Sequence, residues 1–411
     1  MTENMVGNTV GNTAGTPHTV RILHTSDWQL GMDRWFLGDE AGPRYREARL
    51  SVIERLLALA AERDCSAVVV AGDVFDDNLV DDRTWRRAVD ILRGATVPVY
   101  LLPGNHDPYD PASIYRSPVF ADLAPTVQVL TDTVPRPVPG TVAEIVGAPL
   151  LSKYMSSDPV AGALRDLRDR DGDTPQGDRI RVLVGHGATS SRSSTGDPAV
   201  IDVDAAAAAC RERTVDLIAL GDTHSATRLH PDGTVWYSGS PEPTDFREED
   251  GGGEGRSGMV LVTEIRVDPA APTAPATVEV DEVPVGQWHF LALAATVDSD
   301  DDLTAWVERL EALPDKRTTV VKYALTGSVD LATGARLDRE MARLAPSFAA
   351  LYERESRMDL HTVPADAELA DADWPGAVGD AARDLADRTR AGDGTARDAL
   401  RLLYRLSDRE A

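Results

Sequence analysis

The sequence predicts an α/β protein in which strands and helices are layered into an α/β sandwich, followed by a small α+β domain and a helical tail. From residue 20 on, short apolar runs alternate with amphipathic stretches, which is typical of strands and helices packed in layers. After Pro284 the pattern changes and a second series of strands and helices begins. With 411 residues, 42% of them hydrophobic, the chain is long enough for one large domain and a smaller one.

The large domain is predicted from elements whose apolar spacing differs between strands and helices. The first strand covers residues 20–24, and a helix covers residues 45–62. That helix carries apolar side chains at three- and four-residue spacing: Leu50, Ile53, Leu56, Leu57 and Ala60. Further strands are predicted at residues 67–71, 97–102, 180–184 and 217–220, and a further helix at residues 85–93.

The later part of the chain is predicted to form its own domain. Its order is β-α-β-α-β, at residues 288–297, 303–313, 318–325, 335–344 and 356–363, and one more helix is predicted at residues 395–406. We therefore expect a flexible N-terminal tail (1–18), a large α/β domain (19–284), an α+β domain (285–363) and an acidic helical tail (364–411).

The composition excludes several classes of protein. A net charge of −26 argues against a broad basic face for nucleic acid or anionic membrane. Two cysteines, Cys65 and Cys210, exclude a disulfide framework, a zinc ribbon and an iron–sulfur cluster as organising features. No stretch approaches the roughly 18 consecutive apolar residues of a membrane span. We expect a protein of the reducing cytoplasm that does not enter a membrane.

Five polar clusters follow predicted strands: Asp27-Trp28-Gln29, Gly72-Asp73-Val74-Phe75-Asp76, Gly104-Asn105-His106-Asp107, Gly185-His186 and Gly221-Asp222-Thr223-His224. Each cluster alone is also explained as a strand-to-helix turn with a capping side chain. In an open α/β architecture, however, the carboxyl ends of strands converge on a ligand site. Carboxylate, amide and imidazole groups together coordinate divalent first-row metals, and their oxygen richness favours Mn²⁺ or Mg²⁺.

In this order, the clusters resemble the motifs of the calcineurin-like metallophosphoesterases. More narrowly, HTSDWQLG at residues 24–31, AGDVFD at 71–76, PGNHD at 103–107 and YSGSP at 237–241 are similar to the SbcD-type branch, that of double-strand-break repair nucleases. The resemblance covers about residues 20–265. It implies a metallophosphoesterase β-sandwich flanked by helices at residues 19–284 and a capping domain at residues 285–363.

The resemblance implies two metals about 3.5–4 Å apart that share a water molecule. It places one metal on Asp27, Gln29, Asp73 and His224, and the other on Asp73, Asn105, His186 and Asp222. His106 would orient the scissile phosphate or protonate the leaving oxygen, with Asp76 holding its ring. Mn²⁺ is the expected metal, with Mg²⁺ or Fe as alternatives.

Two positions depart from the family pattern, because Gln29 and Asp222 stand where the family usually has histidine. Each metal then loses an imidazole and gains an oxygen donor, which hardens the site. We expect a preference for Mn²⁺ and weaker binding of the metal on Gln29.

The resemblance implies a DNA exonuclease or endonuclease of DNA repair. Its partners would be double-stranded DNA ends and an SMC-like ATPase of the SbcC type, and a homodimer is one form of assembly. Because the chain carries a charge of −26, we expect it to bind duplex DNA weakly by itself. Two alternatives stay open: a phosphoesterase acting on nucleotides or cyclic nucleotides, and a scaffold without activity.

Overall fold

The computed structural model describes residues 17–172, 176–190, 197–362 and 376–408, which form two compact units. The first unit consists of the chain up to residue 33 together with residues 44–244 and 256–287. The second unit consists of residues 34–43, residues 245–255 and the chain from residue 288 on. The two early segments of the second unit were not assigned to it by sequence reasoning, and residues 1–16 of the predicted tail lie outside the described residues.

Two six-stranded sheets build the first unit. The first sheet has the order β13 (Thr277–Pro284), β12 (Met259–Val267), β1 (His18–Thr25), β2 (Ala67–Val70), β3 (Val99–Leu101), β4 (Val127–Val129). The second has the order β5 (Arg136–Pro137), β6 (Ala143–Ala148), β7 (Ile180–His186), β8 (Leu217–Gly221), β10 (Val235–Tyr237), β9 (Thr227–Arg228). In each sheet the inner strands are parallel, so several strands end at the same edge.

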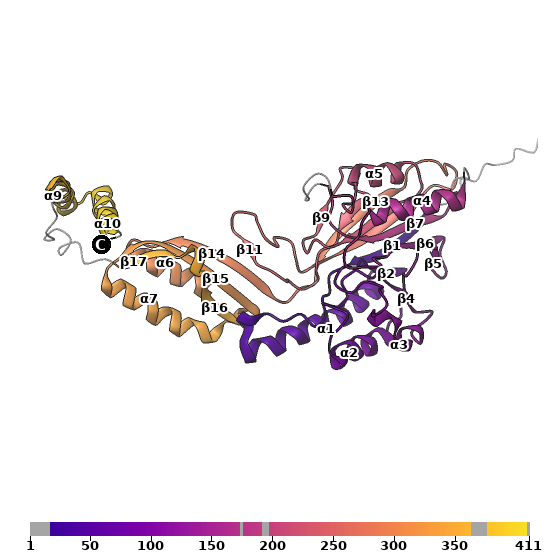
Figure 1. Ribbon diagram of the computed structural model, residues 1–411, viewed down its shortest axis with the longest axis horizontal. Coiled ribbons are helices and arrows are strands. Elements are labelled where there is room, and N and C mark those ends of the chain that lie inside the picture. The colour runs from indigo at the N-terminus through magenta and orange to yellow at the C-terminus, as the bar shows by residue number, and fades with distance from the viewer. Residues whose placement is uncertain (1–16, 173–175, 191–196, 363–375, 409–411) are drawn as a thin grey trace, which may run out of the picture. The chain divides into compact units, whose positions relative to one another are not determined.

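Helices cover the outer faces of both sheets (Figure 1). The first sheet is covered by α1 (Gly38–Glu62), α2 (Asp82–Arg93) and α3 (Pro118–Ala121), and the second by α4 (Pro159–Asp171) and α5 (Val203–Arg211). Between the sheets, Ile22 and Val69 from the first layer pack with Val182 and Ala219 from the second. This arrangement confirms the predicted β-sandwich flanked by helices.

Local sequence explains where these elements begin and end. β2 reads Ala-Val-Val-Val and is buried on both faces, as a central parallel strand requires. Asp81 caps α2 by accepting hydrogen bonds from the backbone N–H groups of Arg83 and Thr84. The predicted strands at residues 20–24, 67–71, 97–102, 180–184 and 217–220 correspond to β1, β2, β3, β7 and β8.

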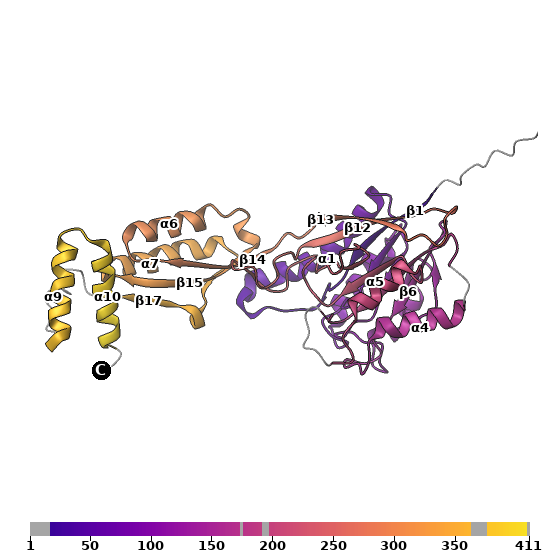
Figure 2. The same ribbon diagram turned by 90° about the horizontal axis from the view of Figure 1, so that it is seen from above.

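The second unit holds a parallel sheet of β11 (Arg247–Glu248), β14 (His289–Thr296), β15 (Thr319–Val329) and β16 (Ala350–Glu353), with β17 (Asp359–Thr362) also paired to β15. Helices α6 (Asp300–Glu311) and α7 (Leu331–Leu344) pack on one face of this sheet (Figure 2). Leu303 and Leu337 from the helices meet Val321 and Leu325 of β15.

Two further helices, α9 (Gly376–Arg390) and α10 (Gly394–Asp408), pair through Ala382, Ala386 and Leu400. The helix predicted at residues 395–406 corresponds to α10. Short 3₁₀ helices occupy Trp35–Leu37, Ile114–Arg116, Lys316–Thr318, Ala345–Ser347 and Glu355–Arg357. Within the described residues, every helix is too short or too polar to cross a bilayer.

Candidate metal centre

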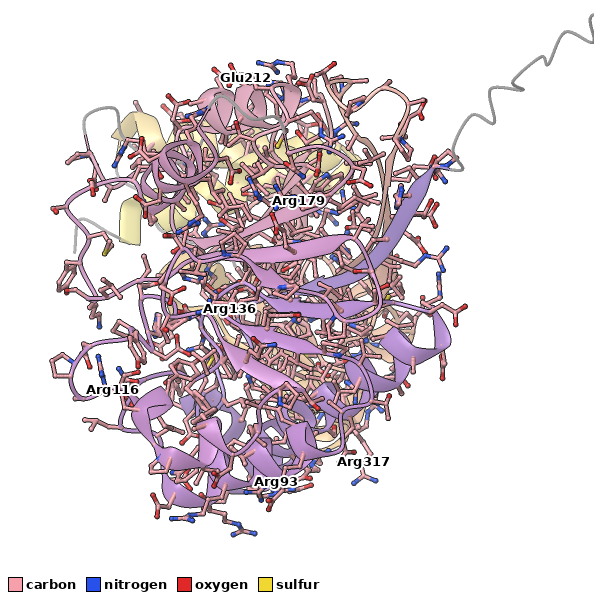
Figure 3. All side chains as sticks on the ribbon, turned by 90° about the vertical axis from the view of Figure 1, so that its right-hand side faces the viewer. Arg93, Arg116, Arg136, Arg179, Glu212 and Arg317 are labelled. Atoms are coloured by element: carbon pink, nitrogen blue, oxygen red, sulfur yellow. The ribbon has the colours of Figure 1, made fainter. Side chains whose placement is uncertain are left out.

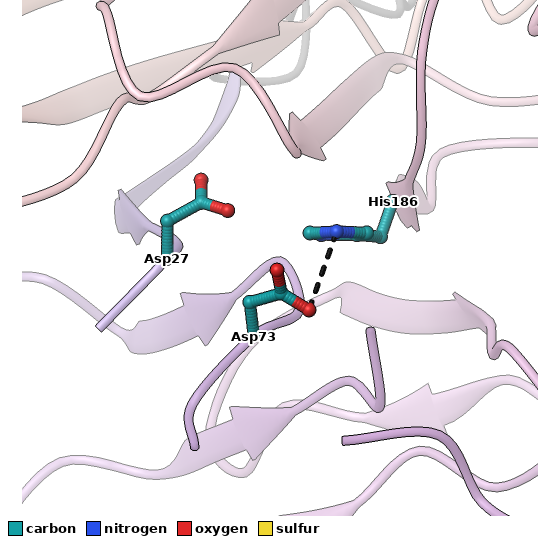
Figure 4. Close-up of side chains that lie close together, drawn as sticks. All are labelled: Asp27, Asp73 and His186. Atoms are coloured by element: carbon teal, nitrogen blue, oxygen red, sulfur yellow. Dashed lines mark ion pairs between the residues drawn. The ribbon is translucent and has the colours of Figure 1, made fainter. Parts of the chain in front are cut away.

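The side chains singled out by the sequence follow the ends of five strands that belong to both sheets. They are Asp27 and Gln29 after β1, Asp73 after β2, Asn105 and His106 after β3, His186 at the end of β7, and Asp222 and His224 after β8. The three buried groups Asp27, Asp73 and His186 each offer a ligand atom, and these atoms lie within 4.8 Å of one another (Figure 4). The sandwich therefore brings residues that are far apart in the sequence into one small volume.

The backbone at this site adopts the left-handed conformation at four residues that are not glycine. The φ angles are +52° at Asp27, +41° at Gln29, +54° at Asp73 and +110° at Asp222. L-residues rarely adopt such angles, and backbone strain of this kind is concentrated at functional sites. Each of these side chains is turned into the site by a sharp bend at the end of its strand.

Two glycines allow the loops to approach closely. A Cβ atom at Gly72 would collide with the ring of His186, and a Cβ atom at Gly104 would collide with the carboxylate of Asp73. The glycine that precedes each acidic or amide residue is therefore required by the packing of the site itself.

The ring nitrogen Nε2 of His186 faces three oxygen atoms. Its Nδ1–H donates to the carbonyl oxygen of Ala71 at 2.8 Å. Its Nε2 lies 2.7 Å from Asn105 Oδ1, 3.4 Å from Asp73 Oδ1 and 3.9 Å from Asp222 Oδ1. Because all three oxygens are hydrogen-bond acceptors, a positive charge is needed between them and Nε2: either a proton or a cation.

The electrostatics of the same groups agree with this reading. Although burial opposes its protonation, the carboxylates of Asp73, Asp27 and Asp222 raise the pKa of His186 well above its ordinary value. Burial also opposes ionisation of Asp73, but His186 and the backbone N–H of His106 outweigh it and lower the pKa of Asp73. The site stabilises positive charge at its centre.

A second group of side chains meets around His224. Its Nε2 lies 3.1 Å from Gln29 Nε2 and 3.9 Å from Asp27 Oδ1. The side-chain oxygen of Gln29 is buried and has no hydrogen-bond partner within the part of the chain that the structure describes. A buried amide oxygen without a partner costs free energy unless a ligand satisfies it.

The donor set fits a pair of divalent cations. One half of the centre holds Asp27, Gln29 and His224, the other holds Asn105, His186 and Asp222, and Asp73 is within reach of His186. Oxygen donors outnumber imidazoles, which suits Mn²⁺ or Mg²⁺ better than a thiolate-seeking metal. The assignment of each ligand stays a prediction.

His106 lies beside these groups, and its side chain is 37% exposed. Its Nδ1 is 2.8 Å from the main-chain carbonyl oxygen of Asp76, whereas the carboxylate of Asp76 is 4.0 Å away. From the sequence we expected the side chain of Asp76 to hold the ring. The contact at hydrogen-bond distance is made by the backbone of Asp76, and the carboxylate lies at the limit of an ion pair, so a role for this side chain stays a prediction.

Sequence reasoning did not identify Asp107, whose hydrogen bonds hold the loop that carries Asn105 and His106. Asp107 is fully buried, and it accepts hydrogen bonds from the N–H of Gly104 at 2.7 Å, the N–H of Phe75 at 3.0 Å and the hydroxyl of Tyr115 at 2.5 Å. Burial raises the pKa of Asp107 to about 6. The only signal in the sequence was the last residue of PGNHD, because Tyr115 lies in no recognisable motif.

Comparison with known proteins identifies the family to which this fold belongs. The model of the calcineurin-like phosphoesterase family matches residues 20–226, half of the chain, so this protein belongs to that family. The family typically uses a centre of two metals, and the buried Asp27, Asp73 and His186 form a candidate site for metal here.

Among the relatives, the DNA double-strand break repair protein Mre11 of Haloferax volcanii is 29% identical over 239 residues, which is 56% of this chain and 47% of that protein. The SbcD component of the nuclease SbcCD from Escherichia coli K12 is 27% identical over 256 residues, 56% of this chain and 62% of that protein. The matches thus span about half to three fifths of these relatives. A solved dimetal phosphatase from Danio rerio aligns with 66% of this chain and all of its own, at 12% identity and a TM-score of 0.36.

Proposed function

We propose that this protein is a two-metal phosphodiesterase that cleaves DNA in the cytoplasm. The observation that carries the proposal is the meeting of seven predicted ligand side chains from five strand ends at one edge of the sandwich. The choice of DNA is supported by the two relatives, one a DNA double-strand break repair protein and the other part of a nuclease.

The residues of the chain suggest how hydrolysis proceeds. When bound, two divalent ions would activate a water molecule and neutralise charge on the phosphate oxygens. The oxygen of the water bonds to phosphorus while the bond from phosphorus to the leaving oxygen breaks. His106 Nδ1–H donates to the carbonyl oxygen of Asp76, so in the doubly protonated ring the Nε2–H is the group that can give its proton to the leaving oxygen, which leaves the neutral ring.

We propose that a partner is needed, because a chain with a net charge of −26 is expected to attract DNA weakly by itself. Arg93, Arg116, Arg136 and Arg179 are spread across the face in Figure 3 instead of gathering into one patch. Arg93, Arg136 and Arg179 are each paired with a carboxylate, and Arg116 lies over the ring of Tyr109. The Escherichia coli relative is one subunit of its nuclease. We propose that an SMC-like ATPase of the SbcC type presents double-stranded ends to this chain.

The decisive assay uses the purified chain with Mn²⁺ and three substrates: an aryl phosphodiester, an aryl phosphomonoester and linear duplex DNA. The wild type is expected to hydrolyse the diester. His106→Ala is expected to lose at least about 100-fold in rate, since a positioned acid contributes about 10²–10⁴-fold. Asp76→Ala serves as the matched control and is expected to stay within a few fold, because the carbonyl that holds His106 remains.

Two results would redirect the assignment. Hydrolysis of nucleotides or cyclic nucleotides in strong preference to the diester and DNA would favour a small-substrate phosphoesterase. Absence of any Mn²⁺-dependent hydrolysis, with or without the ATPase partner, would favour a scaffold role.

A further inference from the structure

The loop that follows β10 carries three buried hydroxyl groups close to the metal centre. Residues 238–244 include Ser238, Ser240 and Thr244, each no more than 1% exposed. We call residues 238–244 the hydroxyl loop. Part of it is the YSGSP segment, for which the proposed hydrolysis gives no role.

Two hydroxyls of this loop hold Asp27. Ser26 donates to Asp27 Oδ2 at 2.5 Å, and its oxygen lies 2.8 Å from Ser238 Oγ. Because the single proton of Ser26 goes to the carboxylate, the hydroxyl of Ser238 donates to Ser26. Ser240 Oγ lies 2.7 Å from the main-chain oxygen of Asp27 and 2.6 Å from that of Glu242, and its one proton is shared between these two acceptors. Both the side chain and the strained backbone of Asp27 are thus oriented from this loop.

The third hydroxyl holds His224. Thr244 Oγ1 lies 2.5 Å from His224 Nδ1. On the other side of the ring, the amide nitrogen of Gln29 can only donate, so His224 Nε2 accepts and Nδ1 carries the proton. The Nδ1–H therefore donates to Thr244 Oγ1. This contact selects the tautomer whose Nε2 lone pair points toward Gln29 and Asp27, which is the form that binds a metal.

The loop itself is anchored to the turn that carries Asp27 and Gln29. Arg49 is 2% exposed and donates to the carbonyl oxygen of Trp28 at 2.6 Å. The same guanidinium lies 3.4 Å from the carbonyl oxygens of Glu242 and Pro243. Tyr45 also donates to the carbonyl oxygen of Pro243, at 2.6 Å. A buried cation and a phenol therefore fix the loop relative to the ligands it contacts.

We propose that the hydroxyl loop sets the metal affinity of one half of the centre, the half formed by Asp27, Gln29 and His224. The other half is oriented from a different place, since His186 donates to the carbonyl oxygen of Ala71. Thr244 and Ser238 are positioning residues that act through His224 and Asp27. The inference rests on the proposed two-metal centre and adds to it a separate control of each half.

The test is a calorimetric titration of the chelator-treated full chain with Mn²⁺. The wild type is expected to bind two ions. Thr244→Val keeps the shape of the side chain but removes the acceptor for His224 Nδ1–H, so one of the two sites is expected to weaken about 10–100-fold while the other is unchanged. Thr244→Ser restores the acceptor and is expected to bind both ions nearly as the wild type does. Ser238→Ala is expected to weaken the same site.

Thr263→Val provides the matched control, because Thr263 is a buried threonine of β12 placed opposite Ile22, well before Asp27 along β1. It is expected to leave both sites unchanged. A readout that needs no metal is the ring nitrogen resonances of His224: the wild type should show Nδ1 protonated, and Thr244→Val should show a mixture of tautomers.

The Mn²⁺ titration distinguishes an error in the proposed role of the hydroxyl loop from an error in the proposed two-metal centre. If the wild type binds two ions and Thr244→Val binds both unchanged, the role of the hydroxyl loop is overturned while the centre stands. Equal weakening of both sites with a lowered melting temperature would likewise reduce Thr244 to a structural residue. A wild type that binds no ion at millimolar Mn²⁺ overturns the centre itself.

Discussion

At the scale of single residues, Gln29 is one of the two predicted ligands that depart from the expected family pattern. The amide oxygen of Gln29 is buried without a partner among the described residues, and the amide nitrogen is 3.1 Å from His224 Nε2. Rotation of the amide would present the oxygen in place of the nitrogen. An amide oxygen is a harder and weaker donor than an imidazole, so this half of the centre should discriminate against metals that favour nitrogen.

Gln29→His should therefore shift the metal preference toward Zn²⁺. We expect the ratio of Zn²⁺ to Mn²⁺ affinity at one site to rise roughly tenfold, because an imidazole replaces an amide oxygen. Competition calorimetry with both ions measures it. Gln128→His, on β4 away from the centre, controls for the addition of a histidine. An unchanged ratio would mean that Gln29 does not contact the metal.

What the sequence could predict at this scale was the set of positions that meet, because each lies in a patterned motif after a strand. It could not predict the contacts that orient them. Thr244 and Tyr115 lie outside the motifs named above. The hydrogen bond that holds His106 is accepted by the main-chain oxygen of Asp76, an atom that every residue type has, so the sequence gives no signal for it. Such contacts depend on how loops fold back, which no local spacing reveals.

At the scale of the elements, the strands that lead into the polar clusters were predicted better than the other strands of the two sheets. Continuous apolar runs such as β2 and β7 are unambiguous because both faces are buried. The missed elements include the strands β6, β12, β13 and β16 and the helices α4, α5 and α9. β16 is only half-buried, and α9 is Ala-, Asp- and Arg-rich with a narrow apolar stripe. Helix α1 begins at Gly38 instead of residue 45. The additional residues 38–43 belong to the second unit.

One buried histidine joins the two sheets and should make the stability of the sandwich depend on pH. His24 of β1 is fully buried, its Nε2–H donates to the carbonyl oxygen of Leu220 in β8 at 3.1 Å, and burial lowers its pKa from 6.5 to about 3. The folded state therefore resists protonation more than the unfolded state does. The stabilisation is complete above pH 6.5 and is lost as the pH falls toward 3.

His24→Gln should remove this dependence while keeping a donor for Leu220. Between pH 7.5 and pH 5, the free energy of unfolding of the wild type should fall by about 2 kcal/mol more than that of the variant. Urea unfolding of both proteins with chelator present measures the difference, and titrating groups common to the two proteins cancel. Equal pH dependence in the two proteins would show that His24 is protonated without cost in the folded state.

At the scale of the whole molecule, charge is the property that constrains function most. The chain carries −26, and many arginines of the first unit are already neutralised, as in the buried group of Arg181 with Glu144 and Asp171. Affinity for duplex DNA comes largely from release of counterions when basic side chains meet phosphates. A chain with a net charge of −26 can release few counterions from DNA, so its proposed action on DNA depends on the basic side chains that its partner contributes.

The expected result is that the chain alone binds duplex DNA more weakly than about 10 μM at roughly 150 mM salt, toward the weak end of non-specific binding. Fluorescence anisotropy of a labelled linear duplex measures this, with His106→Ala used so that the substrate stays intact. Adding the SMC-like ATPase should raise the affinity and make it depend steeply on salt, because the partner supplies the basic contacts. Nanomolar binding by the chain alone would contradict this prediction, since it would require strong basic contacts from a chain whose net charge is −26.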